Sequence, residues 1–466
     1  MARGVPASRR RLPVFPALGP VVDRMLQPPA QPKTQIVIVG GGAAGLKLAA
    51  RLGRKYGSKH HDIILVERNR THIWKPLLHE VATGALDANI DEVGYRAHCH
   101  RWGYRFFNGT LEGIDREKRE VLIAPLLDED GSEIIARHRI RYDYLVLAYG
   151  SVTNDFGTPG VRDNCIFLDS HDQADRFRNR LLDQCLRVSR AMSSGTAQDS
   201  HVRVSIVGAG ATGVELAAEL YNAAEALGHY GLEVFDRSRL KVTVVEAGPR
   251  ILPALSERLA GAAHRELENL GVTILTGTPV TEVTRDGVML GDGSMVEADI
   301  MVWAAGVKAA PIAGSLDGLE VARNGQIVVH PTLQTRSDER VFALGDCAQC
   351  ILPGAERPVP PRAQAAHQMA DTVFDNLVRM MNGRALENYV YKDKGALVSL
   401  SRYSTVGSLM GALVGGSLAI EGRIARFVYM SLYRMHLLSI HGWVRGSALI
   451  AIGRVQAIVR PRLKLH

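Results

Sequence analysis

The sequence predicts an α/β fold because one pattern of strand, glycine turn and helix occurs twice along the chain. Apolar strands at 35–39 and 202–207 end on the turns Gly-Gly-Gly-Ala-Ala-Gly at 40–45 and Gly-Ala-Gly-Ala-Thr-Gly at 208–213, and helical periodicity follows each turn. The 466 residues are also too many for one compact core. Two similar units, each built on a parallel sheet, are therefore expected as separate domains.

Three of the four glycines in the first turn have a physical task. Gly40 permits a tight turn, Gly42 lets the backbone approach a pyrophosphate, and Gly45 lets the helix pack closely on the strand. The phosphates then meet the positive end of the helix. A second strand at 62–66 ends on Glu67, where an acid binds ribose hydroxyls. This unit is predicted to bind a dinucleotide.

The second turn repeats the arrangement with Gly208, Gly210 and Gly213. Its second strand, at 241–245, ends on Glu246. The distance from Gly213 to Glu246 exceeds the usual spacing, and we assign the excess to a longer helix and loop. A carboxylate at Glu246 repels the 2′-phosphate of NADPH, so this unit is expected to prefer NADH.

Matching exit strands close the two units. Residues 142–150 and 298–306 each contain an aspartate, an apolar strand and a terminal glycine. A third strand at 340–344 ends on Gly345 and Asp346. In flavoproteins with two dinucleotide-binding domains, an aspartate at this place accepts a hydrogen bond from the flavin ribityl chain, although it can also be a turn or cap residue. We therefore predict FAD in the first unit and NADH in the second.

These features predict α/β class with two Rossmann-like dinucleotide-binding domains and a C-terminal membrane-associating region. The expected divisions are a basic disordered extension at 1–33, an FAD-binding domain at 34–155 and 325–385, an NADH-binding domain at 156–324, and a C-terminal domain at 386–466. The Arg-rich extension is open to three interpretations: a targeting segment, a basic tail or a start-site artefact.

Charge is concentrated at the two ends of the chain. Residues 1–33 carry six basic residues and one acid, and residues 422–466 carry eight basic residues and no acid, within a formal net charge of +8. The rest of the chain is acidic, which argues against a nucleic-acid partner and favours contact with an anionic membrane surface. The C-terminal stretch also places apolar residues on one helical face, without the length to span a bilayer: Ile424, Phe427, Val428, Leu432, Met435 and Leu438.

A second amphipathic stretch follows Trp443, with basic residues from Arg454 onward. Ordinary core helices of a third domain are the alternative. The uncharged run at 403–420 is weakly apolar, and its Gly-Gly-Ser at 415–417 indicates a turn between two strands better than a membrane span. A peripheral location on the cytoplasmic face of the inner membrane is expected.

Two further motifs make the resemblance specific. The segments Trp-Lys-Pro-Leu-Leu-His-Glu-Val-Ala-Thr-Gly at 74–84 and Ala-Gln-Ala-Ala-His-Gln at 363–368 resemble those of the type II NADH dehydrogenases, the single-subunit NADH:quinone oxidoreductases of respiratory membranes. The similarity runs from about residue 34 to the C-terminus. In that family the second motif lies beside the flavin at the quinone site, which implies this role for Gln364 and Gln368.

The chemistry of these residues fits that role independently. Gln364 and Gln368 are four residues apart and share a helix face, so both amides can bind a quinone carbonyl; two surface glutamines are the alternative. The resemblance places Glu215 near nicotinamide and flavin, whereas an exposed first-turn glutamate is the simpler interpretation. Lys75 is expected to border the flavin. His79 and Glu80 form either part of this site or a capping pair.

The expected activity is transfer of two electrons from NADH through FAD to ubiquinone or menaquinone, without proton pumping, by a protein that is a possible homodimer. No metal-ligand or iron–sulfur spacing is found. A disulfide reductase requires paired cysteines after the first helix, where Cys99 stands alone, although Cys347 and Cys350 form a CxxC. A sulfide:quinone oxidoreductase that joins Cys165 and Cys347 is the closer alternative, but it has no use for a second nucleotide site.

Overall fold

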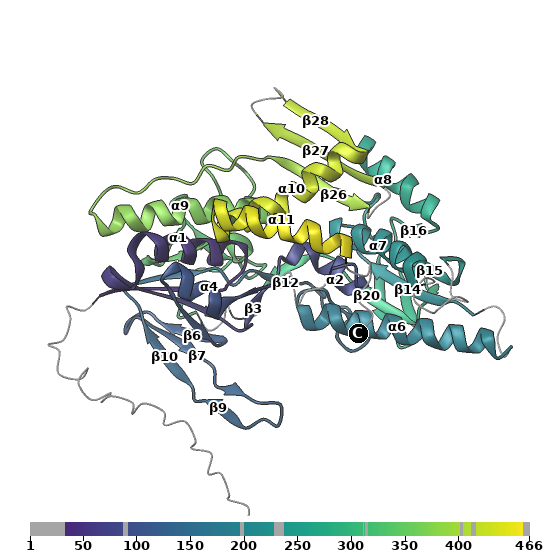
Figure 1. Ribbon diagram of the computed structural model, residues 1–466, viewed down its shortest axis with the longest axis horizontal. Helices are drawn as coiled ribbons and strands as arrows, with labels where there is room; N and C mark the ends of the chain where they lie inside the picture. The colour runs from purple at the N-terminus through teal and green to yellow at the C-terminus, as the bar shows by residue number, and fades with distance from the viewer. Residues whose placement is uncertain are drawn as a thin grey trace, which may run out of the picture.

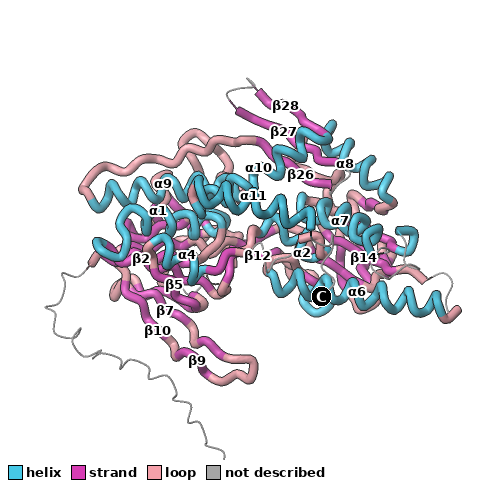
Figure 2. The backbone as a smooth tube through the Cα atoms, in the orientation of Figure 1, coloured by secondary structure: helices cyan, strands magenta, loops and turns pink. Residues whose placement is uncertain are grey.

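The computed structural model describes residues 33–86, 92–195, 200–227, 237–310, 312, 316–400, 404–411 and 416–459. Two sheet-centred units lie side by side, and C-terminal elements lie along one side of both (Figure 1). Helices pack against the sheets in both units (Figure 2). The predicted extension at 1–33 lies outside the described residues except for Lys33.

The sheet of the first unit has eight strands in the order β25-β22-β23-β24-β11-β1-β2-β5. Their bounds are β1 Thr34–Val39, β2 His61–Glu67, β5 Arg105–Asn108, β11 Tyr144–Leu147, β22 Ile327–Val329, β23 Gln334–Thr335, β24 Asp338–Ala343 and β25 Ala348–Cys350. β24 follows the second unit in sequence, yet it pairs in parallel with β11. The first unit is thus completed by chain that comes after the second.

Helices α1 (Ala43–His60), α4 (Tyr95–Trp102) and α9 (Ala363–Met381) cover this sheet. The core beneath them is continuous and aliphatic, with Ile36, Ile38 and Leu46 fully buried. Shorter elements complete the unit: β3 Thr71–His72, β4 Val93–Gly94, β6 Leu111–Asp115, β7 Glu120–Ile123, β8 Leu126–Leu127, β9 Glu133–Ile135, β10 His138–Arg141, and the 3₁₀ turns η2 Lys75–Leu77 and η6 Gly345–Cys347. Helix α2 (Leu78–Thr83) follows η2 in sequence, but its Leu78, Val81 and Ala82 pack in the core of the second unit.

The second unit has a five-stranded parallel sheet in the order β13-β20-β14-β15-β16. The strands are β13 Cys165–Ile166, β14 Val202–Val207, β15 Leu240–Val245, β16 Thr273–Leu275 and β20 Ile300–Trp303. The other elements are α5 Val161–Asn164, α6 His171–Ser193, α7 Ala211–Leu227, η4 Arg237–Arg239, α8 Glu257–Leu270, β17 Val280–Val283, β18 Gly287–Leu290 and β19 Met295–Glu297. Strands β12 (Ser151–Thr153) and β21 (Val307–Ala309) pair antiparallel.

The C-terminal part contains an antiparallel sheet of β26 (Gly395–Leu400), β27 (Ser404–Gly411) and β28 (Gly416–Glu421), followed by α10 (Gly422–His441) and α11 (Trp443–Val459). The 403–420 run contributes two strands, as predicted, but Gly416 and Ser417 of the turn predicted at 415–417 lie in β28. No helix among the described residues is long and apolar enough to cross a bilayer.

Candidate dinucleotide and redox site

The two glycine turns have nearly the same geometry. Gly40 and Gly208 have φ of 105° and 104°, a left-handed conformation that favours glycine. A Cβ on Gly45 would lie 1.9 Å from the Gly40 oxygen, and one on Gly213 would lie 2.0 Å from the Gly208 oxygen. Side chains are excluded at both places because helix and turn are already in contact.

The N-termini of α1 and α7 both have open space beside the middle glycine of their turn, Gly42 and Gly210. A Cβ built on Gly42 or on Gly210 meets nothing within 4 Å. Gly42 caps α1 without any side-chain hydrogen bond to the helix. Backbone N–H groups at such an end bind phosphate oxygens, and the helix dipole adds to the attraction. The observed space and donors fit the pyrophosphate of FAD at the first turn and that of NADH at the second.

An acid fixes the strand end beside each turn. Glu67 accepts a hydrogen bond of 2.7 Å from the Gly41 N–H, and Glu246 accepts one of 2.7 Å from the Ala209 N–H. The second carboxylate oxygen of Glu246 accepts from the Gly248 N–H at 2.8 Å. Both carboxylates are thus oriented at the carboxyl end of the second strand, where a ribose diol binds in this type of fold.

Tyr95 distinguishes the first turn from the second, and the sequence motifs gave no sign of it. Its hydroxyl donates to the Gly41 oxygen at 2.7 Å, and a Cβ on Gly41 would lie 2.4 Å from that hydroxyl. The second turn has Ala209 at the corresponding place. Burial raises the pKa of Tyr95 well above its usual value, so the hydroxyl remains a donor. Gly41 is therefore required for packing, in addition to Gly40, Gly42 and Gly45.

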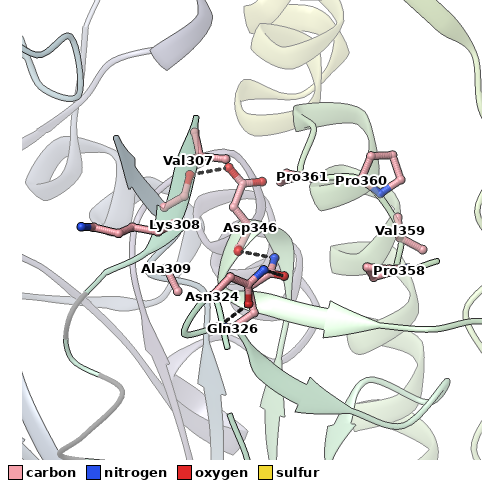
Figure 3. A pocket seen from close by; sticks show the side chains of 11 residues that line it. Val307, Lys308, Ala309, Asn324, Gln326, Asp346, Pro358, Val359, Pro360 and Pro361 are labelled. Atoms are coloured by element: carbon pink, nitrogen blue, oxygen red, sulfur yellow. Dashed lines mark hydrogen bonds between the residues drawn. The ribbon is translucent and has the colours of Figure 1, made fainter. Parts of the chain in front are cut away.

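Asp346 borders a pocket of about 160 Å³ beside the β12–β21 pair (Figure 3). Its carboxylate accepts from the Ser151 hydroxyl at 2.8 Å, and its backbone oxygen accepts from the Gln326 amide at 2.9 Å. Pro360 and Pro361, which precede α9, form another side. A carboxylate, a hydroxyl and an amide around one hollow fit a polyhydroxyl chain. Gly345, with φ of 73°, makes the turn that places Asp346 there.

Glu215 lies on α7 and is 6% exposed, so it is not the exposed first-turn glutamate of the simpler interpretation. Its carboxylate accepts from the Ser399 N–H of β26 at 3.0 Å. The Nδ1 atom of His79 lies 3.6 Å from the other carboxylate oxygen. Burial lowers the pKa of His79 to about 4, which leaves the imidazole neutral at pH 7. His79 and Glu80 both lie in α2, and neither caps the helix.

Gln364 and Gln368 lie on one face of α9, as their spacing predicted, and both are half-buried. Their amides pair with the backbone of the segment before β26. Gln364 donates to the Gly395 oxygen at 3.1 Å and accepts from the Lys394 N–H at 3.0 Å. Gln368 donates to the Lys392 oxygen at 2.9 Å and accepts from its N–H at 2.9 Å. The two glutamines thus attach the C-terminal sheet to the first unit.

Lys75 is half-exposed and directed toward the junction of the units. Its ammonium donates to Asp169 at 2.8 Å and to the Ser151 oxygen at 3.2 Å. Because Ser151 also bonds to Asp346, Lys75 is linked to the pocket through one residue. Its predicted place at the flavin border remains a prediction.

All five cysteines are free. Cys347 and Cys350 are completely buried, and burial raises their thiol pKa values to about 12 and about 11. Burial raises the pKa of Cys165 to about 12 in the core of the second unit. Thiols of this kind stay protonated and unreactive, which disfavours both cysteine-based alternatives. Among the described residues, no group of three or more His, Cys, Asp or Glu side chains is arranged to hold a metal ion.

The two C-terminal helices differ in exposure, although the sequence pattern treated them alike. In the described part of α10, His436 and Ile440 are buried and Ile440 joins the core of the first unit, whereas Met435 of the predicted apolar face is 51% exposed. In α11, Trp443 is 79% and Val444 86% exposed, and Leu449, Ile452 and Val455 are also exposed. Four other side chains of the predicted apolar face lie outside the described residues: Ile424, Phe427, Val428 and Leu432.

Comparison with known proteins first gives the class. The family model described as pyridine nucleotide-disulphide oxidoreductase matches residues 34–370. The structure resembles that of NDH2 from Plasmodium falciparum in complex with NADH, with a TM-score of 0.78 at 18% identity, over 93% of this chain and 100% of that one. The sulfide:quinone oxidoreductase of Aquifex aeolicus is similar with a TM-score of 0.67 at 17% identity, over 91% and 95%. These similarities confirm the predicted α/β fold with two Rossmann-like units.

Curated relatives are more specific. The type II NADH:quinone oxidoreductase of Haemophilus influenzae is 46% identical over 92% of this chain and 99% of its own length. That of Staphylococcus aureus strain NCTC 8325 is 29% identical over 84% and 93%. The chain belongs to the pyridine nucleotide-disulphide oxidoreductase family and, within it, to the type II NADH:quinone oxidoreductases. The resemblance noted from residues 74–84 and 363–368 is confirmed.

Proposed function

We propose that the protein is an FAD-dependent NADH:quinone oxidoreductase that oxidises NADH and reduces a membrane quinone. The observation that carries the proposal is the matched pair of glycine turns, each with an open helix N-terminus and an oriented glutamate. The 46% identity to the H. influenzae enzyme supports the same activity. A protein that needs only one nucleotide has no use for two such sites.

The residues of the two turns bind and orient. A bound flavin would supply the redox chemistry, the transfer of two electrons from NADH to quinone. N–H groups beside Gly42 and Gly210 bind the phosphates, and Glu67 and Glu246 accept from the ribose hydroxyls. Asp346 accepts from the ribityl chain in its pocket. These contacts are proposed roles for the residues named.

Glu215 is proposed to orient the nicotinamide or to handle a proton at the junction of the units. It is held from one side by the Ser399 N–H, and His79 beside it is neutral. The other carboxylate oxygen lies 3.6 Å from His79 Nδ1, and the burial of Glu215 gives its carboxylate a fixed direction. Fixed direction favours a single productive geometry for the substrate.

We propose that α11 attaches the protein to the membrane surface. Its exposed Trp443, Val444, Ile452 and Val455 can enter the headgroup boundary, while basic residues of the C-terminal stretch attract anionic lipid. A peripheral position on the cytoplasmic face of the inner membrane brings the site to a quinone dissolved in the bilayer. Ubiquinone and menaquinone are both candidate substrates, and a homodimer is a candidate assembly.

The decisive experiment mixes the purified protein anaerobically with NADH and records the flavin spectrum, followed by steady-state turnover with a panel of quinones. We expect NADH to bleach the flavin absorbance and quinone to restore it. A spectrum that NADH leaves unbleached would overturn the proposal. Bleaching without reoxidation by any quinone would leave an NADH dehydrogenase with another acceptor.

Glu246→Gln is expected to narrow the preference for NADH over NADPH. Glutamine keeps an acceptor for the ribose diol but removes the negative charge that repels the 2′-phosphate. The ratio of kcat/KM for the two cofactors, measured with ferricyanide as acceptor, reports the change. Glu67→Gln is the matched control, because its carboxylate makes the same backbone contact in the other unit. An unchanged ratio in Glu246→Gln contradicts the assignment.

Gln364→Leu is expected to slow quinone reduction more than flavin reduction. Leucine removes both the amide and its bonds to the 394–395 backbone, so the acceptor side of the site loses a polar contact and its support. Stopped-flow measurement separates the two half-reactions. The result that refutes this role is a loss confined to the NADH half-reaction, with quinone reoxidation at the wild-type rate.

A further inference from the structure

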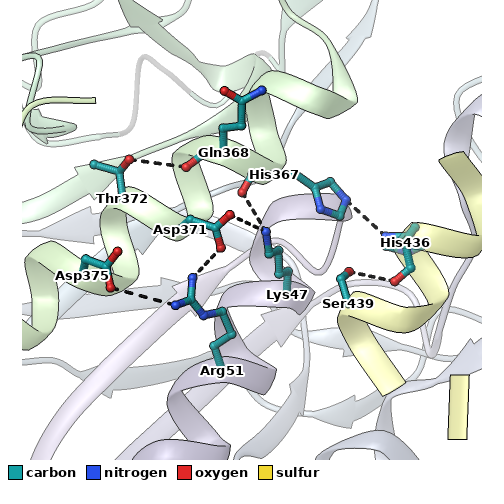
Figure 4. A network of polar contacts seen from close by, with 9 residues as sticks. All are labelled: Lys47, Arg51, His367, Gln368, Asp371, Thr372, Asp375, His436 and Ser439. Carbon is teal, nitrogen blue, oxygen red and sulfur yellow. Dashed lines mark hydrogen bonds and ion pairs between the residues drawn. The ribbon is translucent and has the colours of Figure 1, made fainter. Parts of the chain in front are cut away.

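Three histidines from three distant parts of the chain form a hydrogen-bonded row. His72 lies on β3, His367 on α9 and His436 on α10. The Nε2 atoms of His72 and His436 are 2.9 Å apart, and Nδ1 of His436 is 3.2 Å from Nε2 of His367. Figure 4 shows the contact between His367 and His436 beside the Lys47 and Asp371 ion pair. No role proposed above uses this row.

One arrangement of protons gives the nitrogens of this row suitable partners. Burial lowers the pKa of His72 to about 4, and a hydrogen bond to the Gly41 backbone opposes that shift. If His72 donates to Gly41, its Nε2 accepts from His436 Nε2, and His436 Nδ1 then accepts from His367 Nε2. Each imidazole is neutral; His72 and His436 each act once as donor and once as acceptor, and His367 donates to His436. The middle ring, His436, therefore needs both of its nitrogens.

The surroundings keep the row neutral. Burial lowers the pKa of His367 to about 3 and that of His436 well below its usual value. The charged or titratable groups that face the row come from each packed element. They are Lys47 on α1, His98 on α4, Asp371 on α9, Lys394 before β26 and His441 at the end of α10. Asp371 alone of these favours protonation of His367, and it is already paired with Lys47.

The row connects helix α10 to two segments of the proposed active site. At one end is Gly41, in the turn that binds the first nucleotide, and at the other is the helix turn that contains Gln364 and Gln368. The indole ring of Trp74, in the segment that leads to Lys75, stacks on the His436 ring with centroids 4.1 Å apart. Displacement of His436 would thus disturb the row and its aromatic neighbour together.

We propose that His436 is a positioning residue for quinone reduction, acting through His72 and His367 to hold α10 against both segments of the active site. The inference rests on the proposed function for its kinetic consequence. It adds to that function a pH-sensitive contact between the flavin unit and the C-terminal helices. The three rings are neutral while α10 is docked, that is, while it packs against these two segments. Uptake of a proton by any of the rings therefore opposes docking of α10.

The direction of the pH effect follows from the neutral state. An ordinary histidine has a pKa near 6.5, whereas His72 in the row has a value of about 4. The undocked side chains therefore bind protons first as pH falls. Docking of α10 is fully favoured above pH 6.5 and is lost progressively as pH falls toward about 4. Quinone turnover is expected to fall over the same range while ferricyanide reduction persists.

The test compares His436→Leu and His436→Gln in the full-length holoenzyme. Leucine breaks both bonds and is expected to raise the KM for quinone by about tenfold, the scale set by leaving a buried polar group without its partner. Glutamine keeps a donor for His72 but has no titratable ring. It should therefore restore the wild-type KM for quinone at pH 7.5 and move the fall in quinone turnover to lower pH. His264→Gln on α8, a half-exposed histidine outside the row, is the matched control.

A second readout does not depend on quinone. Hydrogen exchange of the peptide that spans residues 431–441 should accelerate, after correction for intrinsic rates, in wild type below pH 6 and in His436→Leu at pH 7.5. FAD content should remain that of wild type. If wild type reduces no quinone, the proposed function fails, whereas exchange still decides whether the row holds α10.

Two results would overturn the proposal. One is that His436→Leu has the wild-type KM for quinone, loses quinone turnover over the same acid pH range as wild type, and has the wild-type hydrogen-exchange rate. The other is an equal loss of FAD, ferricyanide reduction and quinone reduction in both variants, because glutamine then fails to rescue and the residue serves the fold in general.

Discussion

Gly210→Ala is expected to raise the KM for NADH by about tenfold or more, which corresponds to a loss of about 1.4 kcal/mol in binding free energy. A Cβ at this position meets no protein atom within 4 Å, so the substitution leaves the packing of the second unit unchanged. The space it fills is the one that the pyrophosphate is proposed to approach. Steady-state kinetics with ferricyanide measure the effect, and thermal unfolding checks that stability is retained.

Two matched variants make this result specific. Gly42→Ala has the same open surroundings in the first unit, so it should weaken FAD retention and leave the NADH KM of the remaining holoenzyme unchanged. Gly261→Ala adds a methyl group to α8 in the second unit, 3.6 Å from the Arg265 guanidinium, and should change neither property. A wild-type NADH KM in Gly210→Ala would place the nucleotide elsewhere.

Replacement of Val444, Ile452 and Val455 by aspartate is expected to release the protein from anionic vesicles and to abolish turnover with a long-tailed quinone. The three side chains are 86%, 51% and 62% exposed, so the change should not disturb the core. Full burial of an aliphatic side chain contributes about 1.5–3 kcal/mol, and each aspartate also repels anionic lipid. Vesicle sedimentation at moderate salt measures attachment, and ferricyanide reduction should stay near wild type.

The control for this experiment is the pair Leu127→Asp and Ile134→Asp in the β8–β9 hairpin. These side chains are 52% and 56% exposed, similar to those on α11, but belong to the first unit. They should leave vesicle binding intact. If the α11 variant still sediments with vesicles, attachment lies in another segment. If the hairpin variant is released, the β8–β9 hairpin is the site of attachment.

The repeated local pattern allowed the sequence alone to determine the fold class and the two nucleotide turns. A strand followed by glycines at fixed spacing specifies its turn by sterics within about ten residues, as the contacts of Gly45 and Gly213 illustrate. The acids at Glu67 and Glu246 were predictable for the same reason, because each ends the strand next to its turn. The identity of the family followed from two short motifs.

Contacts between distant segments were decided only by the tertiary structure. Tyr95 beneath Gly41, Ser399 on Glu215 and the row of His72, His436 and His367 join residues that are 54 to 364 positions apart. The sequence also assigned α10 and α11 one role, since both have apolar residues at helical spacing. Periodicity identifies an apolar face but not what covers it: α10 packs into the first unit through His436 and Ile440 and leaves Met435 exposed, whereas Val444, Leu449, Ile452 and Val455 of α11 are all exposed.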